Sequence, residues 1–305
     1  MPEIRDVCGI IVTYNPTNNC IHAIERNCNT LAKVIICDNS TNNENANLLS
    51  NLVNNLNQKF NGPEQKIILI KNPQNNGLSV SYNRCASIAK DLGFTFIVLL
   101  DQDSFFENGS FEALLKDYDQ LSSLCQVGAI SPSYLKNGRS FYDFLFDGRF
   151  KWKGFYYSEH IIERRDLINS GMLIALSVFY SASGYDERIF LDNSDRNFTL
   201  RLRLKGYRIF QSLNSKLIHN FGEKTPSKSK VKILYRAPDR DYFIKDLIGC
   251  LPIAKKLSFV DFSLIVLLLF SKILSTLLLK DMKKQRFDYI AKGIKGSAIL
   301  HRDKC

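Results

Sequence analysis

The sequence predicts an α/β fold, in which a mostly parallel sheet is flanked by helices and followed by a helical C-terminal extension. Three observations support this prediction. Short apolar runs alternate with stretches of helical spacing over the first hundred residues, polar residues follow these runs, and positive charge gathers near the C-terminal end. The chain has 305 residues, of which 45% are hydrophobic, so it can bury a core without disulfides or a structural metal.

The first four expected strands are continuous apolar runs. Such strands, when helices separate them, are typical of a parallel sheet that is covered on both faces. The turns after the first three runs are rich in Asn, Asp and Ser, and ligands of open α/β sheets bind at these carboxyl ends of the strands. We expect the four strands at residues 7–13, 34–38, 66–71 and 94–101.

The second half of the chain is less regular. We expect a helix over residues 109–122, a strand over 127–131, and a helix over 193–205 that ends at Gly206. An aromatic segment at 140–157 has two interpretations: a core segment with strands, or an aromatic wall beside a sugar site. Two further short strands are expected at 207–211 and 216–219.

Positive charge is confined to the end of the chain. Residues 224–305 hold 18 basic and seven acidic residues, which accounts for the whole net charge of +11. A neutral body with a basic end suggests one local anionic partner, either a membrane surface or a nucleic acid. The eight cysteines form no CxxC pair, so we expect reduced thiols in a cytoplasmic protein. The N-terminus lacks the basic and apolar regions of a signal peptide.

The apolar run Leu257–Leu279 lies within this basic end. It approaches the length of about 20 residues that a spanning helix needs, but Asp261 and Lys272 interrupt it. Its basic flanks suit an interfacial helix or a helical hairpin on an anionic membrane. A buried core helix and a true span are the alternatives. Because apolar residues are mixed with the basic ones, we expect lipid rather than nucleic acid as the partner.

Asp101-Gln102-Asp103 is the motif that most strongly suggests chemistry. Its two carboxylates come at the end of an apolar strand, two residues apart, so both can face the same side. One could contact a ribose or a sugar while the other binds Mg²⁺ or Mn²⁺, ions that take oxygen ligands and bridge a diphosphate. A solvated turn is the plain alternative, because an Asp-x-Asp sequence is frequent by chance.

Several motifs together resemble family 2 glycosyltransferases, whose GT-A fold is Rossmann-like, and the bacterial rhamnosyltransferases in particular. The first four are VTYNP at 12–16, DNST at 38–41, NPQNNG at 72–77 and LLDQDS at 99–104. The similarity continues in 169–174, 183–187 and 190–195, in His219 with Gly222, and in Pro238, Arg240, Tyr242 and Phe243. It covers about residues 7–250, with a weaker similarity at 291–296.

The resemblance implies a role for each matching residue. Asp103 would bind the metal, Asp101 would touch ribose or sugar, and Asp195 would be the catalytic base. His219 would help to hold the metal or the diphosphate, although a structural role suits a single His equally well. The other residues expected to bind nucleotide or substrate are Thr13, Tyr14, Asn15, Asp38 (on a uracil or thymine base), Asn76, Gly77, Asn83, Gln102, Asp192 and Arg240.

Asp195 falls in the first turn of the expected 193–205 helix. The helix dipole favours a low pKa there, so the surrounding pocket must offset the dipole if Asp195 is to act as a base. Asn197 stands where the family has an acid, and Lys245-Asp246 replaces the family's Arg-Asn. The base and the metal aspartate remain, so we expect activity. No Q-x-x-R-W stretch is present in the sequence, which argues against a processive polymer synthase.

The resemblance implies inverting transfer of L-rhamnose from dTDP-rhamnose to a saccharide. The acceptor would be a lipid-linked precursor of lipopolysaccharide O-antigen or capsule, at the inner, cytoplasmic face of the cell membrane. Residues 1–222 would form the catalytic domain, with a nucleotide-sugar half to about residue 103 and an acceptor half at 104–222, and 223–305 would form the extension. The alternatives are a UDP-hexose or UDP-N-acetylhexosamine transferase of the same fold, and a non-enzymatic nucleotide- or nucleic-acid-binding protein.

Overall fold

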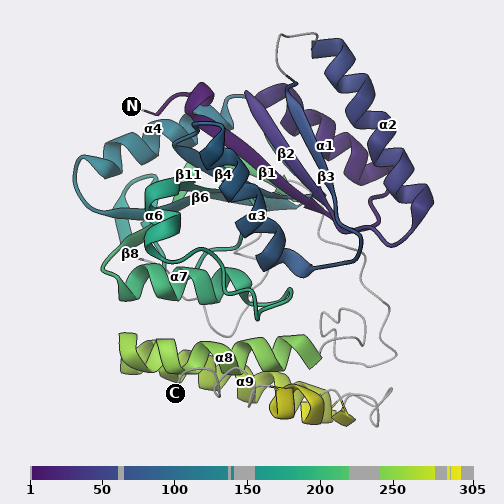
Figure 1. The fold of residues 1–305 in the computed structure, drawn as a ribbon. Coiled ribbons are helices and arrows are strands. Elements are labelled where there is room, and N and C mark those ends of the chain that lie inside the picture. The colour runs from purple at the N-terminus through teal and green to yellow at the C-terminus, as the bar shows by residue number, and fades with distance from the viewer. Residues whose placement is uncertain are drawn as a thin grey trace.

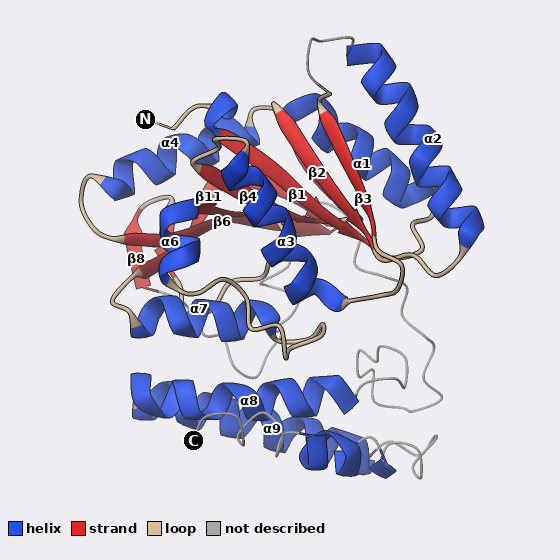
Figure 2. Ribbon diagram, viewed as in Figure 1, coloured by secondary structure: helices blue, strands red, loops and turns tan. Residues whose placement is uncertain are grey.

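One sheet crosses the body of the protein, with helices on both of its faces (Figures 1 and 2). The structure is a computed structural model, and it describes residues 2–60, 65–136, 139–140, 155–219, 241–278, 287–288 and 290–296. The strands are β1 (Val7–Thr13), β2 (Lys33–Asp38), β3 (Ile67–Lys71), β4 (Phe96–Asp101), β5 (Ser104–Phe106), β6 (Val127–Lys136), β7 (Arg139–Ser140), β8 (Phe155–Ser158), β9 (Ile161–Glu163), β10 (Met172–Ala175) and β11 (Arg208–His219). The helices are the 3₁₀ helix η1 (Ile4–Asp6), α1 (Asn18–Thr30), α2 (Asn43–Phe60), α3 (Gly77–Asp91), α4 (Ser110–Ser122), α6 (Leu176–Ser181), α7 (Ser194–Leu204), α8 (Asp241–Leu257) and α9 (Phe259–Leu278).

The N-terminal half of the sheet is parallel, as the sequence predicts. Its strands lie in the order β3-β2-β1-β4, and α1, α2 and α3 connect them in turn. Every residue of β1 and β2 is buried, because helices cover both faces. In the register of these strands Thr13 lies opposite Asp38, and Val12 lies opposite Asp101. The carboxyl ends of β1, β2 and β4 therefore meet at one edge of the sheet, where ligands of such sheets bind.

Beyond β4 the sheet is mixed, which corrects the prediction of a mostly parallel sheet. The order continues β10-β6-β11-β9-β8, and β10 runs antiparallel to both β4 and β6. Just before β10, Gly171 has a φ of 77° in the left-handed region, and its N–H donates to the Leu99 carbonyl at 2.7 Å. Helix α4 and strand β6 lie between β4 and β10 in the chain, so these two paired strands are not consecutive in sequence.

β11 is one long strand instead of the two short strands expected at 207–211 and 216–219. Its pairing with β6 is parallel on both sides of a register shift between Gln211 and Lys216. Within the shifted stretch, Leu213 N–H donates to the His160 carbonyl at 2.8 Å, so the backbone stays bonded to the neighbouring turn. A bulge of this kind keeps a strand continuous while bending it, and the local sequence pattern does not distinguish it from a break.

Two apolar clusters form the core, one on each face of the sheet. Helices α1, α2 and α4 contribute to one cluster, and α3, α6 and α7 contribute to the other. The helix predicted at 109–122 is confirmed as α4, and the helix predicted at 193–205 is confirmed as α7, which ends before Gly206 at a φ of 88°. Of the aromatic segment, residues 141–154 lie outside the described residues, and Tyr157 packs edge-on against Phe210 as a core residue would.

The C-terminal extension includes helices α8 and α9, which lie beneath α7 in Figure 1. Leu257 ends α8, so the predicted helix starts two residues later than expected, at Phe259. Ser258 lies at the break and caps α9: its hydroxyl accepts from the Asp261 N–H at 3.0 Å and donates to the Asp261 carboxylate. Among the described residues, no helix is long and apolar enough to cross a membrane.

Asp261 connects this extension to the body of the protein. Its carboxylate is buried and accepts from Arg165 at 3.0 Å and from Arg203 at 2.8 and 3.1 Å. Burial by itself would raise the pKa of Asp261, but the hydrogen bonds from Arg203 and Ser258 hold that pKa below its usual range. Nearby, Leu200 of α7 packs into an apolar cluster of α8 and α9 residues. The helices are therefore docked on the body by both charge and apolar contact.

Candidate active site

Three potential metal ligands meet where β4 ends. Asp101 is the last residue of β4, and Asp103 precedes the short strand β5. β5 pairs antiparallel with the end of β11 in a register that sets Ser104 opposite His219. His219 Nε2 lies 2.9 Å from Asp101 Oδ2, and its Nδ1 lies 3.8 Å from Asp103 Oδ1. The structure thus brings the two expected metal ligands, Asp103 and His219, together with Asp101, for which a ribose or sugar contact was expected. His219 is 118 residues from Asp101 in sequence.

The chemistry of this group fits a divalent cation. One ligand atom from each of Asp101, Asp103 and His219 lies within 4.8 Å of the others. His219 is almost fully buried, whereas the two carboxylates are partly open to solvent, so a ligand can approach from their side. Two carboxylates supply the negative charge and oxygen atoms that Mg²⁺ or Mn²⁺ prefers, and an imidazole can complete the set.

Gln102 has a supporting role between the two aspartates. Its side-chain Oε1 accepts from the Tyr14 N–H at 2.9 Å, and its Nε2 donates to the Tyr14 carbonyl at 3.4 Å. This pair of bonds holds the loop after β1 against the loop after β4. The Tyr14 ring remains exposed, and its hydroxyl lies 3.4 Å from the Thr41 hydroxyl. Gln102 therefore orders the edge of the site, which a motif comparison does not reveal.

Asp38 is buried at the end of β2 with one of its oxygens fully engaged. Asp38 Oδ1 accepts from the Thr13 hydroxyl at 2.8 Å, the Ser40 N–H at 3.1 Å and the Ser40 hydroxyl at 2.5 Å. Asp38 Oδ2 has no hydrogen bond from any described residue. This oxygen keeps some access to solvent, so a ligand can reach it, and the N–H of a planar ring is one suitable donor.

Asn15 shapes the loop beside Asp38. It has a φ of 45°, a left-handed conformation that Asn tolerates better than most residues. Its N–H donates to the Ser40 hydroxyl at 2.9 Å, and its side-chain oxygen accepts from the Thr41 and Asn42 N–H groups at 3.1 and 3.0 Å. The loops after β1 and β2 are therefore joined into one wall of the site.

The start of α3 connects this wall to the loop before α7. Asn76 caps α3 and its N–H lies 3.4 Å from Asn39 Oδ1. Gly77 has a φ of 81°, and a Cβ at this position would collide with the Phe190 carbonyl oxygen. The next N–H, that of Leu78, donates to the same carbonyl at 2.7 Å. Only glycine allows this close approach, so Gly77 positions the loop that leads to Asp195.

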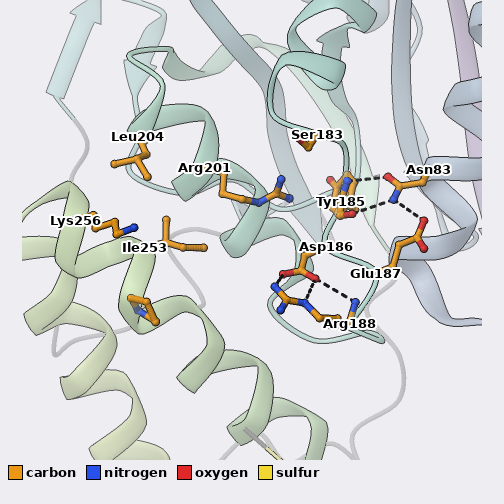
Figure 3. A pocket seen from close by; sticks show the side chains of 11 residues that line it. Asn83, Ser183, Tyr185, Asp186, Glu187, Arg188, Arg201, Leu204, Ile253 and Lys256 are labelled. Atoms are coloured by element: carbon orange, nitrogen blue, oxygen red, sulfur yellow. Dashed lines mark hydrogen bonds and ion pairs between the residues drawn. The ribbon is translucent and has the colours of Figure 1, made fainter. Parts of the chain in front are cut away.

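Asn83 bonds to a different loop from the other predicted nucleotide residues. Its Nδ2 donates to the Tyr185 carbonyl and to Glu187 Oε1, both at 2.9 Å, and its Oδ1 accepts from the Tyr185 N–H at 2.7 Å. These contacts fasten α3 to the turn at 183–188. Asn83 lines a cavity there that includes none of Asp101, Asp103 and His219 (Figure 3).

Asp195 lies in the first turn of α7 and is half-buried. Burial raises its pKa to about 6, and the charge of Arg196 together with the Arg196 N–H opposes that rise. The negative charges of Asp166 and Asp101 add to it. Loss of solvent therefore offsets the low pKa that the helix dipole favours, as a base at this position requires. A carboxylate with this pKa is ionised at neutral pH and able to accept a proton.

The remaining candidates lie around Asp195 or outside the described residues. Asp192 is half-buried just before α7, and Arg240 lies outside the described residues. Asn197, which replaces an expected acid, accepts from Arg201 Nε at 2.9 Å. Sequence reasoning missed Asp166, which accepts from Arg196 at 2.8 and 3.1 Å. No local pattern marks Asp166, because its partner is 30 residues away.

Comparison with known proteins gives a consistent result. The family model described as "Glycosyl transferase family 2" matches residues 9–180, which is more than half of the chain. A curated relative, the dTDP-rhamnosyl transferase RfbF of Shigella flexneri, is 24% identical over 249 residues, which cover 78% of this chain and 77% of the relative.

Two solved structures are similar to this chain in fold. A crystal structure of GalNAc-T7 with UDP, GalNAc and Mn²⁺ superposes with a TM-score of 0.60 at 10% identity and covers 93% of this chain. This chain spans only 54% of that protein. A crystal structure of residues 1–349 of S. aureus TarS in complex with UDP-GlcNAc has a TM-score of 0.54 at 15% identity, covering 95% of this chain and 81% of TarS.

Proposed function

Because the chain belongs to glycosyltransferase family 2 and is a glycosyltransferase with a GT-A-like fold, we propose that it transfers L-rhamnose from dTDP-rhamnose to a saccharide. The observation that carries the donor assignment is the likeness to a dTDP-rhamnosyl transferase along 78% of the chain. Membership of the family removes the non-enzymatic alternative.

In this proposal the donor lies across the carboxyl ends of β1, β2 and β4. Asp38 Oδ2 accepts the ring N–H of thymine, because Asp38 Oδ1 is already engaged by Thr13 and Ser40. Asp101, Asp103 and His219 would hold Mg²⁺ or Mn²⁺, which would neutralise charge on the departing diphosphate.

Asp195 acts as the general base of a single inverting displacement. The acceptor hydroxyl attacks the anomeric carbon, the bond from that carbon to the diphosphate oxygen breaks, and the hydroxyl proton moves to Asp195. The pKa of about 6 supports this role, because it keeps Asp195 ionised at neutral pH while leaving it basic enough to take the proton. Asp166 and Arg196 would hold the start of α7 in place during the step.

A panel of donors tests the reaction. The purified full chain is offered dTDP-rhamnose, UDP-glucose and UDP-N-acetylglucosamine, each with Mn²⁺, with Mg²⁺ or with excess EDTA, and the released nucleoside diphosphate is measured. We expect release of dTDP from dTDP-rhamnose with either metal and almost none with EDTA. Preferential turnover of a UDP-sugar would favour the UDP-hexose or UDP-N-acetylhexosamine alternative, and full activity in EDTA would exclude the metal role of Asp103.

We also place the enzyme at the inner face of the cell membrane, where a lipid-linked acceptor such as an O-antigen or capsule precursor would be available. The support comes from α9, which has one face on the protein and an apolar face directed away from it. One face is buried against the protein through Asp261 and Ile265. The opposite face is open and follows helical spacing. Its exposed residues are Phe259 (82%), Leu267 (53%), Phe270 (63%) and Leu274 (42%).

Charge and apolar surface act together on this extension. Lys255, Lys256, Lys292 and Lys295 are exposed, and each basic residue near an anionic surface contributes about 1 kcal/mol to binding. Exposed apolar residues add burial in the lipid boundary that salt does not screen. The enzyme would therefore be peripheral, resting on the membrane through α9.

Vesicle sedimentation tests this placement. The full chain carrying Leu267→Glu and Phe270→Glu should no longer sediment with phosphatidylglycerol vesicles, because two charges would enter the lipid boundary. Leu124→Glu is the matched control, since Leu124 is 62% exposed on the body, and this variant should sediment like the unchanged protein. Equal sedimentation of both variants would exclude α9 as the contact. High salt should weaken binding of the unchanged protein only in part.

A further inference from the structure

A cavity lies between the body and the extension, apart from the metal ligands (Figure 3). Its volume is about 520 Å³. The turn at 183–188 and the end of α7 form one wall, and α8 forms the other, so the cavity exists only because α8 docks on the body. The lining residues from α7 and α8 are Arg201, Leu204, Pro252, Ile253 and Lys256.

The charges in this cavity are not balanced. Asp186 is engaged by Arg188, whose Nε and Nη2 donate to its two oxygens at 2.8 and 2.7 Å. Glu187 accepts from Asn83. The carboxylates therefore have partners, and the lining contains three cationic residues against two acidic ones.

Arg201 is held in place by hydrogen bonds to neutral groups. Its Nε donates to Asn197 and its Nη1 donates to the Ala182 carbonyl, while its Nη2 is buried with no hydrogen-bond partner among the described residues. Asn197 is neutral, so the main negative charge acting on Arg201 comes from Asp186, whose two oxygens are already engaged by Arg188. A buried guanidinium stays protonated, so this charge persists at the cavity wall.

Lys256 lines the wall of the cavity that α8 forms. It is exposed in the last turn of α8, and no ion pair or hydrogen bond to its ammonium occurs within the described part of the chain. Arg201 and Lys256 thus face one cavity from two separate elements, with apolar Leu204 and Ile253 between them (Figure 3). Such a pair attracts an anion that is attached to a larger, partly apolar molecule.

We propose that this cavity binds an anionic group of the acceptor, a phosphate or a carboxylate, through the charges of Arg201 and Lys256. The inference rests on the proposed function, because it assumes that an acceptor hydroxyl is presented to Asp195. Asp195 and Arg201 lie on the same helix six residues apart, which is about 9 Å along its axis. An oligosaccharide acceptor can span that distance, with its reacting hydroxyl at one end of α7 and its anionic group at the other.

Direct binding of inorganic pyrophosphate gives the first test. Calorimetry on the full chain uses excess EDTA and no vesicles, so that neither a metal-bound site nor a membrane contributes. Lys256→Gln should weaken binding roughly tenfold, the loss expected when one charge-assisted contact is removed. Lys255→Gln is the matched control, because Lys255 is an exposed neighbour that does not line the cavity, and it should bind like the unchanged protein. Equal effects of the two variants, or no saturable binding at all, would overturn the proposal.

Kinetics with paired acceptors then identify the source of the anion. The same oligosaccharide is compared as a lipid diphosphate, as a neutral alkyl glycoside, and as an alkyl glycoside carrying a uronic acid. Lys256→Gln should raise KM roughly tenfold for whichever anionic form the cavity takes, leave kcat unchanged, and not affect the neutral form. An equal rise for all three forms would overturn the proposal. Failure of the proposed function would look different: no transfer from dTDP-rhamnose to any acceptor, with pyrophosphate binding intact.

Discussion

The protonation state of Asp195 controls the proposed reaction. Burial raises its pKa to about 6, and a general base must be deprotonated to work. We therefore expect kcat to be constant above about pH 7 and to fall tenfold per pH unit below about pH 6. Asp195→Asn should lower kcat by about 10²–10⁴-fold with donor binding nearly unchanged. The measurement is a pH profile of dTDP release, with donor affinity determined separately.

Asp192→Asn is the control for this prediction, because Asp192 lies just before the same helix and is also half-buried. Asp192→Asn should keep the pH profile of the unchanged protein. If Asp195→Asn retains more than roughly a tenth of the rate, the base is Asp192 instead. Both variants should remain folded, since an amide costs less free energy to bury at neutral pH than the ionised carboxylate it replaces.

The sequence predicts individual site residues better than it predicts their environment. Asp101 and Asp103 are recognisable because they end an apolar run, and His219 is recognisable from its motif. The raised pKa of Asp195 is not predictable in this way, because it comes from residues that only the fold brings near. The hydrogen bonding of Gln102 to the Tyr14 backbone cannot be predicted from the sequence for the same reason.

At the scale of elements, strand positions follow from the sequence but strand directions do not. The four N-terminal strands are predictable because buried parallel strands are continuous apolar runs. β10 is just as apolar, yet it runs antiparallel to β4, a direction that its own residues do not indicate. The start of α9 could have been predicted, because Ser258-x-x-Asp261 is a capping-box sequence. This sequence lies within the apolar run Leu257–Leu279, which by itself predicts one uninterrupted helix.

Gly77 provides a test of how α3 positions the loop before α7. Gly77→Ala combines an unfavourable positive φ, which costs about 1 kcal/mol, with a collision against the Phe190 carbonyl. We expect a loss of about 2–3 kcal/mol in the free energy of unfolding and a fall in kcat, because the Phe190 loop leads to Asp195. Urea unfolding and dTDP release measure the two effects.

Gly93→Ala separates the two causes. Gly93 has a similar φ of 85°, but a Cβ at this position would meet no other atom within 4 Å, so this variant bears only the conformational cost. It should lose about 1 kcal/mol and keep its kcat. Equal losses of stability and rate in both variants would show that the approach of Gly77 to Phe190 has no bearing on the site.

At the scale of the whole molecule, the charge of Asp261 fixes the extension to the body. Asp261→Ala would leave Arg165 and Arg203 without their carboxylate, and breaking a buried pair costs about 3 kcal/mol. We expect a lower urea midpoint and faster proteolysis within α8 and α9. Asp91→Ala, at an exposed position, should change stability by less than about 0.5 kcal/mol.

The pH dependence of this effect has a definite sign. The pKa of Asp261 is held below its usual range, so its stabilising effect is fully present above the ordinary carboxyl pKa of about 3.9 and is lost as pH falls through the lower, folded-state value. The difference in stability between the unchanged protein and Asp261→Ala should therefore be constant from pH 5 to 8 and shrink only under strongly acidic conditions. A difference that is absent at pH 7 would mean that apolar packing alone docks the extension.

The separation of the proposed metal ligands along the chain has a consequence for synthesis on the ribosome. The parallel strands β1 to β4 lie within residues 7–101, whereas His219 emerges 118 residues after Asp101. At a translation rate of about 5–20 residues per second, this interval lasts roughly 6–24 s. The nascent chain can therefore fold its nucleotide edge well before β11 arrives to complete the metal site. Catalytic competence comes late in translation, and a product truncated in that interval would lack the third ligand.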